Sequence, residues 1–103
     1  MTVVDTVPPA ARPDRPATQL LHDEESVRIV SFHLLAHQEV APHRSGSTVV
    51  VQVIEGEGIF RGGDDEAHLL TGGTAVFAAG ETHSMKPVGG PLRFLAIITP
   101  RPL

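Results

Sequence analysis

The apolar and polar positions of this chain follow short runs rather than a helical period. No stretch places apolar residues at positions i, i+3, i+4 and i+7 over three turns; residues 17–25 come closest, over too short a length. The apolar runs are rich in β-branched residues, and turn residues separate them roughly every 8–12 positions. This spacing predicts an all-β fold, either a sandwich or a barrel.

Several segments are predicted strands because they are rich in Val, Ile and Phe and end in turns rich in Gly or acidic residues. Residues 47–54 are the most strongly β-branched of these segments, and they end in the turn Glu55-Gly56-Glu57-Gly58. The predicted strands are residues 27–34, 47–54, 59–61, 67–70, 74–78 and 92–99.

The predicted strand at residues 47–54 is apolar on both faces. Alternation along a strand puts Val49, Val51 and Val53 on one face. The opposite face then carries Val50 and Ile54, together with Gln52. A strand buried on both faces needs a cover outside the barrel, either from its own chain or from a second subunit.

The length of 103 residues suits one domain. Residues 1–17 contain four of the nine prolines and almost nothing to bury, so we expect a flexible N-terminal arm. The structured β-barrel domain is expected to span residues 18–103.

Composition excludes several classes of function. The net charge is -4, and eight basic residues scattered singly cannot neutralise a row of phosphates, so no nucleic-acid partner is expected. The absence of cysteine excludes disulfides, thiolate metal sites and a cysteine nucleophile. No apolar run reaches the roughly 18 residues of a membrane helix, and no secretory signal opens the chain. We therefore expect a cytoplasmic protein without a membrane partner.

Two spaced motifs contain histidines. The first runs from His37 to Gly56 (HQEVAPHRSGSTVVVQVIEG), and the second runs from Gly72 to Pro87 (GGTAVFAAGETHSMKP). They resemble the two cupin motifs, G-x5-H-x-H-x3-4-E-x6-G and G-x5-P-x-G-x2-H-x3-N, and the resemblance covers most of residues 27–99. It implies a cupin-type double-stranded antiparallel β-barrel of the jelly-roll kind. It also implies a homodimer, with the outward-facing Val50 and Ile54 at or near the interface.

The resemblance is weaker at the metal-binding positions. In metal-binding cupins two histidines, an acidic residue and a third histidine hold the ion, and the matching residues here are His43, Ser45, Val49 and His83. Val49 cannot bind a metal, and a serine hydroxyl is a poor ligand for a divalent ion. A metal such as zinc, nickel, copper or iron would therefore need His33, His37 or water to complete its coordination. No Asp or Glu falls at a strand position expected to face inward.

We expect a barrel pocket lined by His43, Ser45, Val49, Val51, His83 and Met85. The sequence favours a cupin that binds a small organic molecule there, because Val49, Val51 and Val53 are found where a metal site would need charged groups. Two enzymatic alternatives stay open. One is a metal-dependent enzyme, similar to cupin dioxygenases or isomerases, with an incomplete ligand set. The other is metal-free acid/base catalysis by the two histidines, because an ordinary imidazole titrates near physiological pH.

Overall fold

The computed structural model describes residues 1–102, and these residues form an all-β fold. Within this part of the chain there is no helix, and therefore none that could cross a membrane. The strands are β1 (Ala17–Glu24), β2 (Val27–Leu34), β3 (Val40–His43), β4 (Thr48–Glu55), β5 (Gly58–Gly62), β6 (Asp65–Leu69), β7 (Thr74–Phe77), β8 (His83–Pro87) and β9 (Leu92–Thr99).

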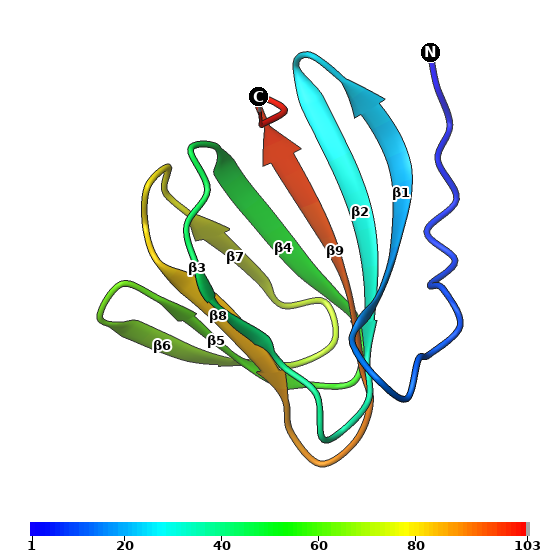
Figure 1. Cartoon of the computed structure of the whole chain (residues 1–103), viewed down its shortest axis with the longest axis vertical. Helices are drawn as coiled ribbons and strands as arrows, with labels where there is room; N and C mark the ends of the chain where they lie inside the picture. The colour runs from blue at the N-terminus through cyan, green and yellow to red at the C-terminus, as the bar shows by residue number, and fades with distance from the viewer. Residues whose placement is uncertain (103) are drawn as a thin grey trace.

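The strands form two antiparallel sheets on opposite sides of the molecule (Figure 1). The larger sheet has the order β1-β2-β9-β4-β7, and the smaller sheet has the order β3-β8-β5-β6. Most connections between consecutive strands cross from one sheet to the other, so the chain winds around a shared interior. The prediction of an antiparallel barrel of two facing sheets is confirmed.

The two sheets pack together through their apolar inner faces. On β4, Val49, Val51 and Val53 are all buried, as the alternation predicted. The rings of Phe60 on β5 and Phe94 on β9 meet edge to face across the interior, with their centroids 5.6 Å apart. On the outer face of β4, Val50 is half-buried and Ile54 is exposed, so a single copy of the chain leaves this face partly uncovered.

Three strands, β1, β3 and β8, lie outside the predicted segments, and β1 and β3 are edge strands without a clear signal in the sequence. β1 lies at a sheet edge and contains an irregularity between Leu20 and His22, which breaks the alternation of apolar and polar residues. β3 has only four residues, contains Pro42, and is also an edge strand. An edge strand tolerates proline and solvent on one side, so its composition does not resemble that of a central strand.

Some acidic residues expected in turns belong to strands instead. Glu55 ends β4, and Asp65 and Glu66 begin β6. The β5–β6 hairpin closes tightly because Gly62 pairs with Asp65, and Gly63 has the positive φ of 57° that this turn requires. Hydrogen bonding to the neighbouring strand therefore extends β4 and β6 into residues that on their own prefer turns. The side chains of Glu55, Asp65 and Glu66 are all exposed.

The N-terminal arm, residues 1–16, has no regular secondary structure but contacts the barrel beside β1 (Figure 1). The Nδ1–H of His33 donates to the carbonyl oxygen of Pro9 at 2.9 Å. The side-chain amide of Gln38 donates to the carbonyl oxygen of Arg12. Both His33 and Gln38 are buried. The mobility of the arm stays a prediction.

Gly56 should be far less tolerant of a side chain than Gly72, although both have a left-handed backbone, with φ of 90° and 87°. A Cβ at Gly56 would overlap the carbonyl oxygen of Pro91 in the β8–β9 connection, whereas open space surrounds Gly72. We expect Gly72→Ala to lower the free energy of unfolding by about 1–2 kcal/mol, through backbone strain alone. Gly56→Ala should cost at least about 1 kcal/mol more, because backbone must move as well. Urea unfolding measures the free energy of unfolding of both variants. Equal losses would contradict the close approach of the Pro91 carbonyl oxygen to Gly56.

Candidate functional site

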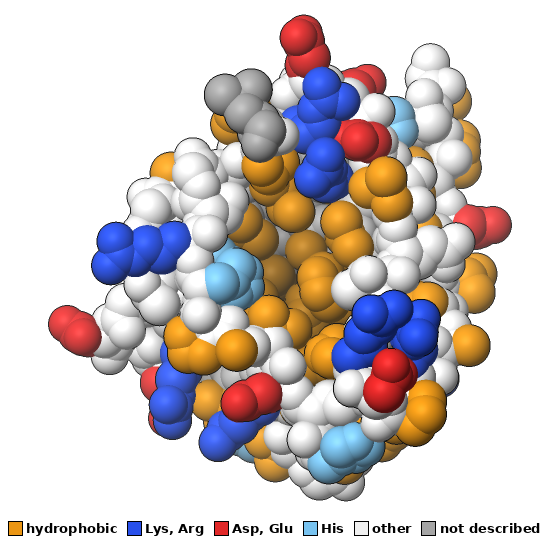
Figure 2. Space-filling model, viewed as in Figure 1, with side chains coloured by type: hydrophobic (Ala, Val, Ile, Leu, Met, Phe, Trp, Pro, Cys, Tyr) orange, Lys and Arg blue, Asp and Glu red, His pale blue; other side chains and the backbone are white. Residues whose placement is uncertain are grey.

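A cavity of about 370 Å³ opens between the two sheets. Its wall is mostly apolar, and Figure 2 shows hydrophobic side chains gathered in the hollow of this face, with a histidine beside them. The polar side chains of the wall are His43, Arg44, Ser45 and His83. The apolar ones come from both sheets and include Phe32, Val40, Val49, Met85, Ala96 and Ile98.

Strand pairing brings the two histidines of this wall together. β3 and β8 are antiparallel neighbours, and His43 lies directly opposite His83 in their register. The centroids of the two imidazole rings are 4.1 Å apart, and the rings meet edge to face at 68°. Residues that are far apart in sequence therefore form one polar group at the wall of an apolar cavity.

Both imidazoles have the same hydrogen-bonding pattern. Nδ1 of His43 lies 2.9 Å from the carbonyl oxygen of Ala41, and Nδ1 of His83 lies 3.1 Å from that of Glu81. A carbonyl oxygen only accepts, so each Nδ1 carries the hydrogen and each neutral ring keeps its lone pair on Nε2. The pair can therefore accept hydrogen bonds from a ligand or donate electron pairs to a metal ion.

The two histidines differ in environment. His83 is only 3% exposed, and its ring stacks on Phe77 with centroids 4.7 Å apart and planes 10° from parallel. Burial lowers the pKa of His83 below its usual value near 6.5; a charge on His43 lowers it further, and the bond to the Glu81 carbonyl opposes both effects. His83 is therefore neutral at physiological pH. His43, in contrast, is exposed.

The structure brings five of the six predicted pocket residues into this one wall: His43, Ser45, Val49, His83 and Met85. Val51 faces the same side of β4 as Val49 but is not part of the wall. It is fully buried in the hydrophobic core, because the two sheets close over this part of the strand.

The residues do not fit the metal site that the cupin motifs imply. His33 lies on the strand face opposite the cavity-lining Phe32 and is bonded to the N-terminal arm, and His37 is exposed in the β2–β3 connection. Neither residue lines the cavity with His43 and His83. Within residues 1–102, no group of three or more His, Cys, Asp or Glu side chains could hold a metal ion. Zinc sites in enzymes usually have three protein ligands.

Sequence reasoning missed part of the wall. Arg44, beside His43, was not expected in the pocket, although its position next to the first motif histidine could have indicated it. Phe32, Ala96 and Ile98 lie on β2 and β9, which pair with each other and face the smaller sheet. Their strands were predicted correctly, but the alternation of residues does not reveal which strands flank a cavity.

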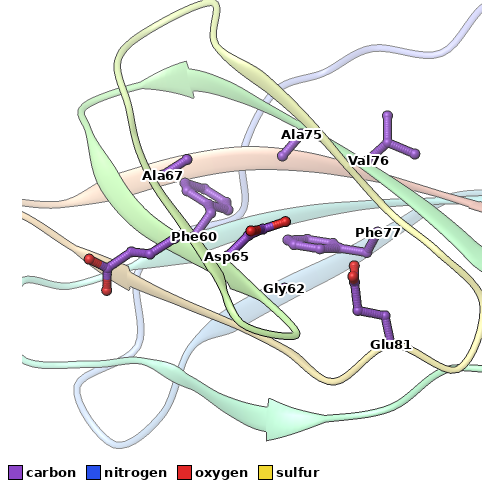
Figure 3. A pocket seen from close by; sticks show the side chains of 9 residues that line it. Phe60, Gly62, Asp65, Ala67, Ala75, Val76, Phe77 and Glu81 are labelled. Carbon is purple, nitrogen blue, oxygen red and sulfur yellow. The ribbon is translucent and has the colours of Figure 1, made fainter.

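A second, smaller cavity of about 160 Å³ lies between β5, β6 and β7. In Figure 3 the carboxylates of Asp65 and Glu81 both point toward the ring of Phe77. Because Phe77 also stacks on His83, this aromatic pair separates the smaller cavity from the larger one. Gly62 allows the close packing, since a Cβ there would meet Phe77 and Glu81.

Comparisons with known proteins agree with this architecture. Residues 29–102 match the family model described as AraC-like ligand binding domain. The chain is similar to the protein TT1209 from Thermus thermophilus, with 29% identity, 91% of each chain covered and a TM-score of 0.86. It is similar to an RmlC-like cupin protein from Desulfovibrio desulfuricans, with 30% identity, 88% of each chain covered and a TM-score of 0.80.

A third similar structure is a protein with a double-stranded β-helix domain from Klebsiella pneumoniae. Its identity is 24%, its TM-score is 0.81, and the alignment covers 92% of this chain and 84% of that one. No curated protein matches the sequence.

The buried, neutral state of His83 should make stability depend on pH. A base whose folded pKa is lowered gives its full contribution above the unfolded pKa, near 6.5, and this contribution is lost as pH falls through the folded pKa. Relative to His83→Gln, the wild type should therefore lose free energy of unfolding as pH drops from 7 to 5. Urea unfolding at several pH values measures this difference.

A direct NMR titration of the His83 ring checks the cause. A pKa at or above 6.5 for this ring would contradict the conclusion that burial lowers the pKa of His83.

Proposed function

The chain belongs to the family of AraC-like ligand-binding domains, and we propose that it binds a small organic molecule in the cavity between its two sheets. The cupin fold expected from the two histidine motifs is confirmed by the solved structures that it resembles. The observation that carries the proposal is the pair of Nε2 atoms, unbonded within residues 1–102, at the wall of an apolar cavity. Small-molecule sites commonly combine an apolar wall with a few polar groups.

The chemistry of the wall defines the ligand in outline. The volume of about 370 Å³ lies within the usual range of roughly 300–1,000 Å³ for ligand pockets. Val49, Met85 and Ile98 offer surface to an apolar body. A neutral His83 accepts at Nε2, so this atom can bind a hydroxyl or an amine hydrogen of a ligand.

An apolar alcohol should therefore bind in this cavity. We expect 1-octanol to produce saturable NMR shifts of the Val49 and Met85 methyl groups. Ile98→Trp should weaken this binding at least about tenfold by filling the cavity, a loss of about 1.4 kcal/mol. Leu95→Trp is the matched control, because Leu95 lies on the opposite face of the same strand and outside the cavity, and it should bind like the wild type. Equal binding by both variants would place the alcohol elsewhere.

Metal analysis separates this proposal from a metal-dependent enzyme that uses the same histidines. The protein should be purified without a chelating tag, since such a tag would bind metal itself. We expect far less than one equivalent of zinc, nickel, copper or iron. A stoichiometric metal that is lost in His43→Ala would favour the metal-dependent alternative.

A homodimer is the assembly that the outer face of the larger sheet supports. Val50 of β4 pairs with Val76 of β7 on one side and with Ile97 of β9 on the other, and Ile97 pairs with Ile29 of β2. This apolar row carries no charge and runs across four strands, with Val76 64% exposed. A twofold axis would place the row against its own copy, which makes the face self-complementary.

Charges placed in this row should separate the subunits. Light scattering at micromolar concentration should give a dimer for the wild type and a monomer for both Val50→Asp and Val76→Asp. Val76 is exposed, so its variant should fold even if Val50→Asp does not. Ile59→Asp, on the smaller sheet, is the control and should stay dimeric. A monomeric wild type would contradict the proposal.

A further inference from the structure

We infer that the ligand of this cavity is a monocarboxylate with an apolar tail, held at its charged end by Arg44 and Ser45; this inference rests on the proposed ligand-binding function. The first observation is the charge of the wall. Arg44 is the only Lys, Arg, Asp or Glu among the described residues that line it. An anion is therefore the charged group that this wall favours.

Arg44 has no carboxylate partner within residues 1–102. Its Nε donates to the hydroxyl oxygen of Thr82 at 3.0 Å, which orients the guanidinium and leaves its terminal nitrogens available. Five of the other six arginines do have such a partner, and Arg15 of the N-terminal arm is the exception among the described residues. Arg61 contacts Glu66 at 2.6 Å, and Arg93 contacts Glu55 at 2.9 Å. An arginine without an acidic partner at a cavity is suited to an acidic ligand, because its planar group matches a carboxylate with two parallel hydrogen bonds.

The β3–β4 connection, which carries Arg44 and Ser45, is fixed by contacts to distant parts of the chain. The amide of Gly80 donates to the carbonyl oxygen of Ser45 at 2.7 Å. The hydroxyl of Ser47 donates to the carbonyl oxygen of Pro100. With the Arg44–Thr82 bond, these contacts hold the connection against two other segments, the β7–β8 connection and the residues after β9. Binding then needs little ordering of the site, which favours affinity.

Ser45 offers a second donor at the same end of the cavity. Its Oγ accepts from the amide of Ser47 at 3.1 Å, so the hydroxyl hydrogen is free to point to another acceptor. Ser45 lines the cavity beside Arg44, and a carboxylate oxygen is a suitable acceptor for both. A single guanidinium balances one negative charge, so the site suits a monoanion. The apolar tail would lie along Val49 and Ile98.

Octanoate and 1-octanol provide a matched pair of probes with the same tail and different head groups. At pH 7.5 octanoate is ionised, and we expect the wild type to bind it at least about tenfold more tightly than 1-octanol, as charge-assisted hydrogen bonds predict. Arg44→Gln should reduce this ratio of dissociation constants to near one, and Arg44→Lys should restore part of it. Titration followed by NMR at the Met85 methyl group measures all three.

Arg61→Gln is the control for net charge, because Arg61 lies outside the cavity and its loss changes the total charge equally. It should keep the wild-type ratio. If 1-octanol binds in the cavity but octanoate binds no more tightly, or if Arg44→Gln leaves the ratio unchanged, the carboxylate inference is wrong and the ligand-binding proposal stands. If neither probe shifts the Met85 signal, both are wrong.

Discussion

The packing of the two sheets through their inner faces is the constraint on which the rest of this molecule depends. Where large side chains such as Phe60 and Phe94 meet, the sheets close and the interior is solid. Toward β3, the wall includes Val49 and Ala96, and there the sheets leave a cavity instead of a core. The ladder between β3 and β8 borders this cavity, so the same pairing that completes the smaller sheet also sets the position of the histidines. Fold and site therefore share one set of contacts.

The two histidines have the same hydrogen-bonding pattern but different physical roles. His83 is held from one side by Phe77 and from another by the Glu81 carbonyl, and its burial disfavours the charged form. His43 stays in contact with solvent. The wall thus offers a neutral acceptor next to a more accessible ring, with the charge of Arg44 nearby. Such a wall supports the recognition of an organic ligand through directed hydrogen bonds, and its ligand set matches a metal ion poorly.

The outer face of the larger sheet is divided in two. Near β1 and β2 the N-terminal arm provides carbonyl groups that satisfy His33 and Gln38, so polar side chains are buried there without loss of hydrogen bonds. Farther along the sheet, the row that contains Val50 and Ile97 is only partly covered by the described part of the same chain, and Val76 in this row is exposed. The sequence places apolar residues on the outer face of β4, whereas only assembly with a second copy would cover them.

The sequence by itself determined the strand-and-turn pattern, the inner face of β4 and the pairing of His43 with His83. It could do so because alternation reports which side chains share a face, and the motif spacings place both histidines in known positions of a barrel. The edge strands β1 and β3, the inner strand β8 and the acidic strand residues of the β5–β6 hairpin were not predicted, since ladder pairing makes these residues strands against their own preference. Only the tertiary structure decided that Val51 is core, that His33 faces the arm and that Arg44 reaches the cavity. Each of these depends on which segments become neighbours in space, and that information is absent from the local order of residues.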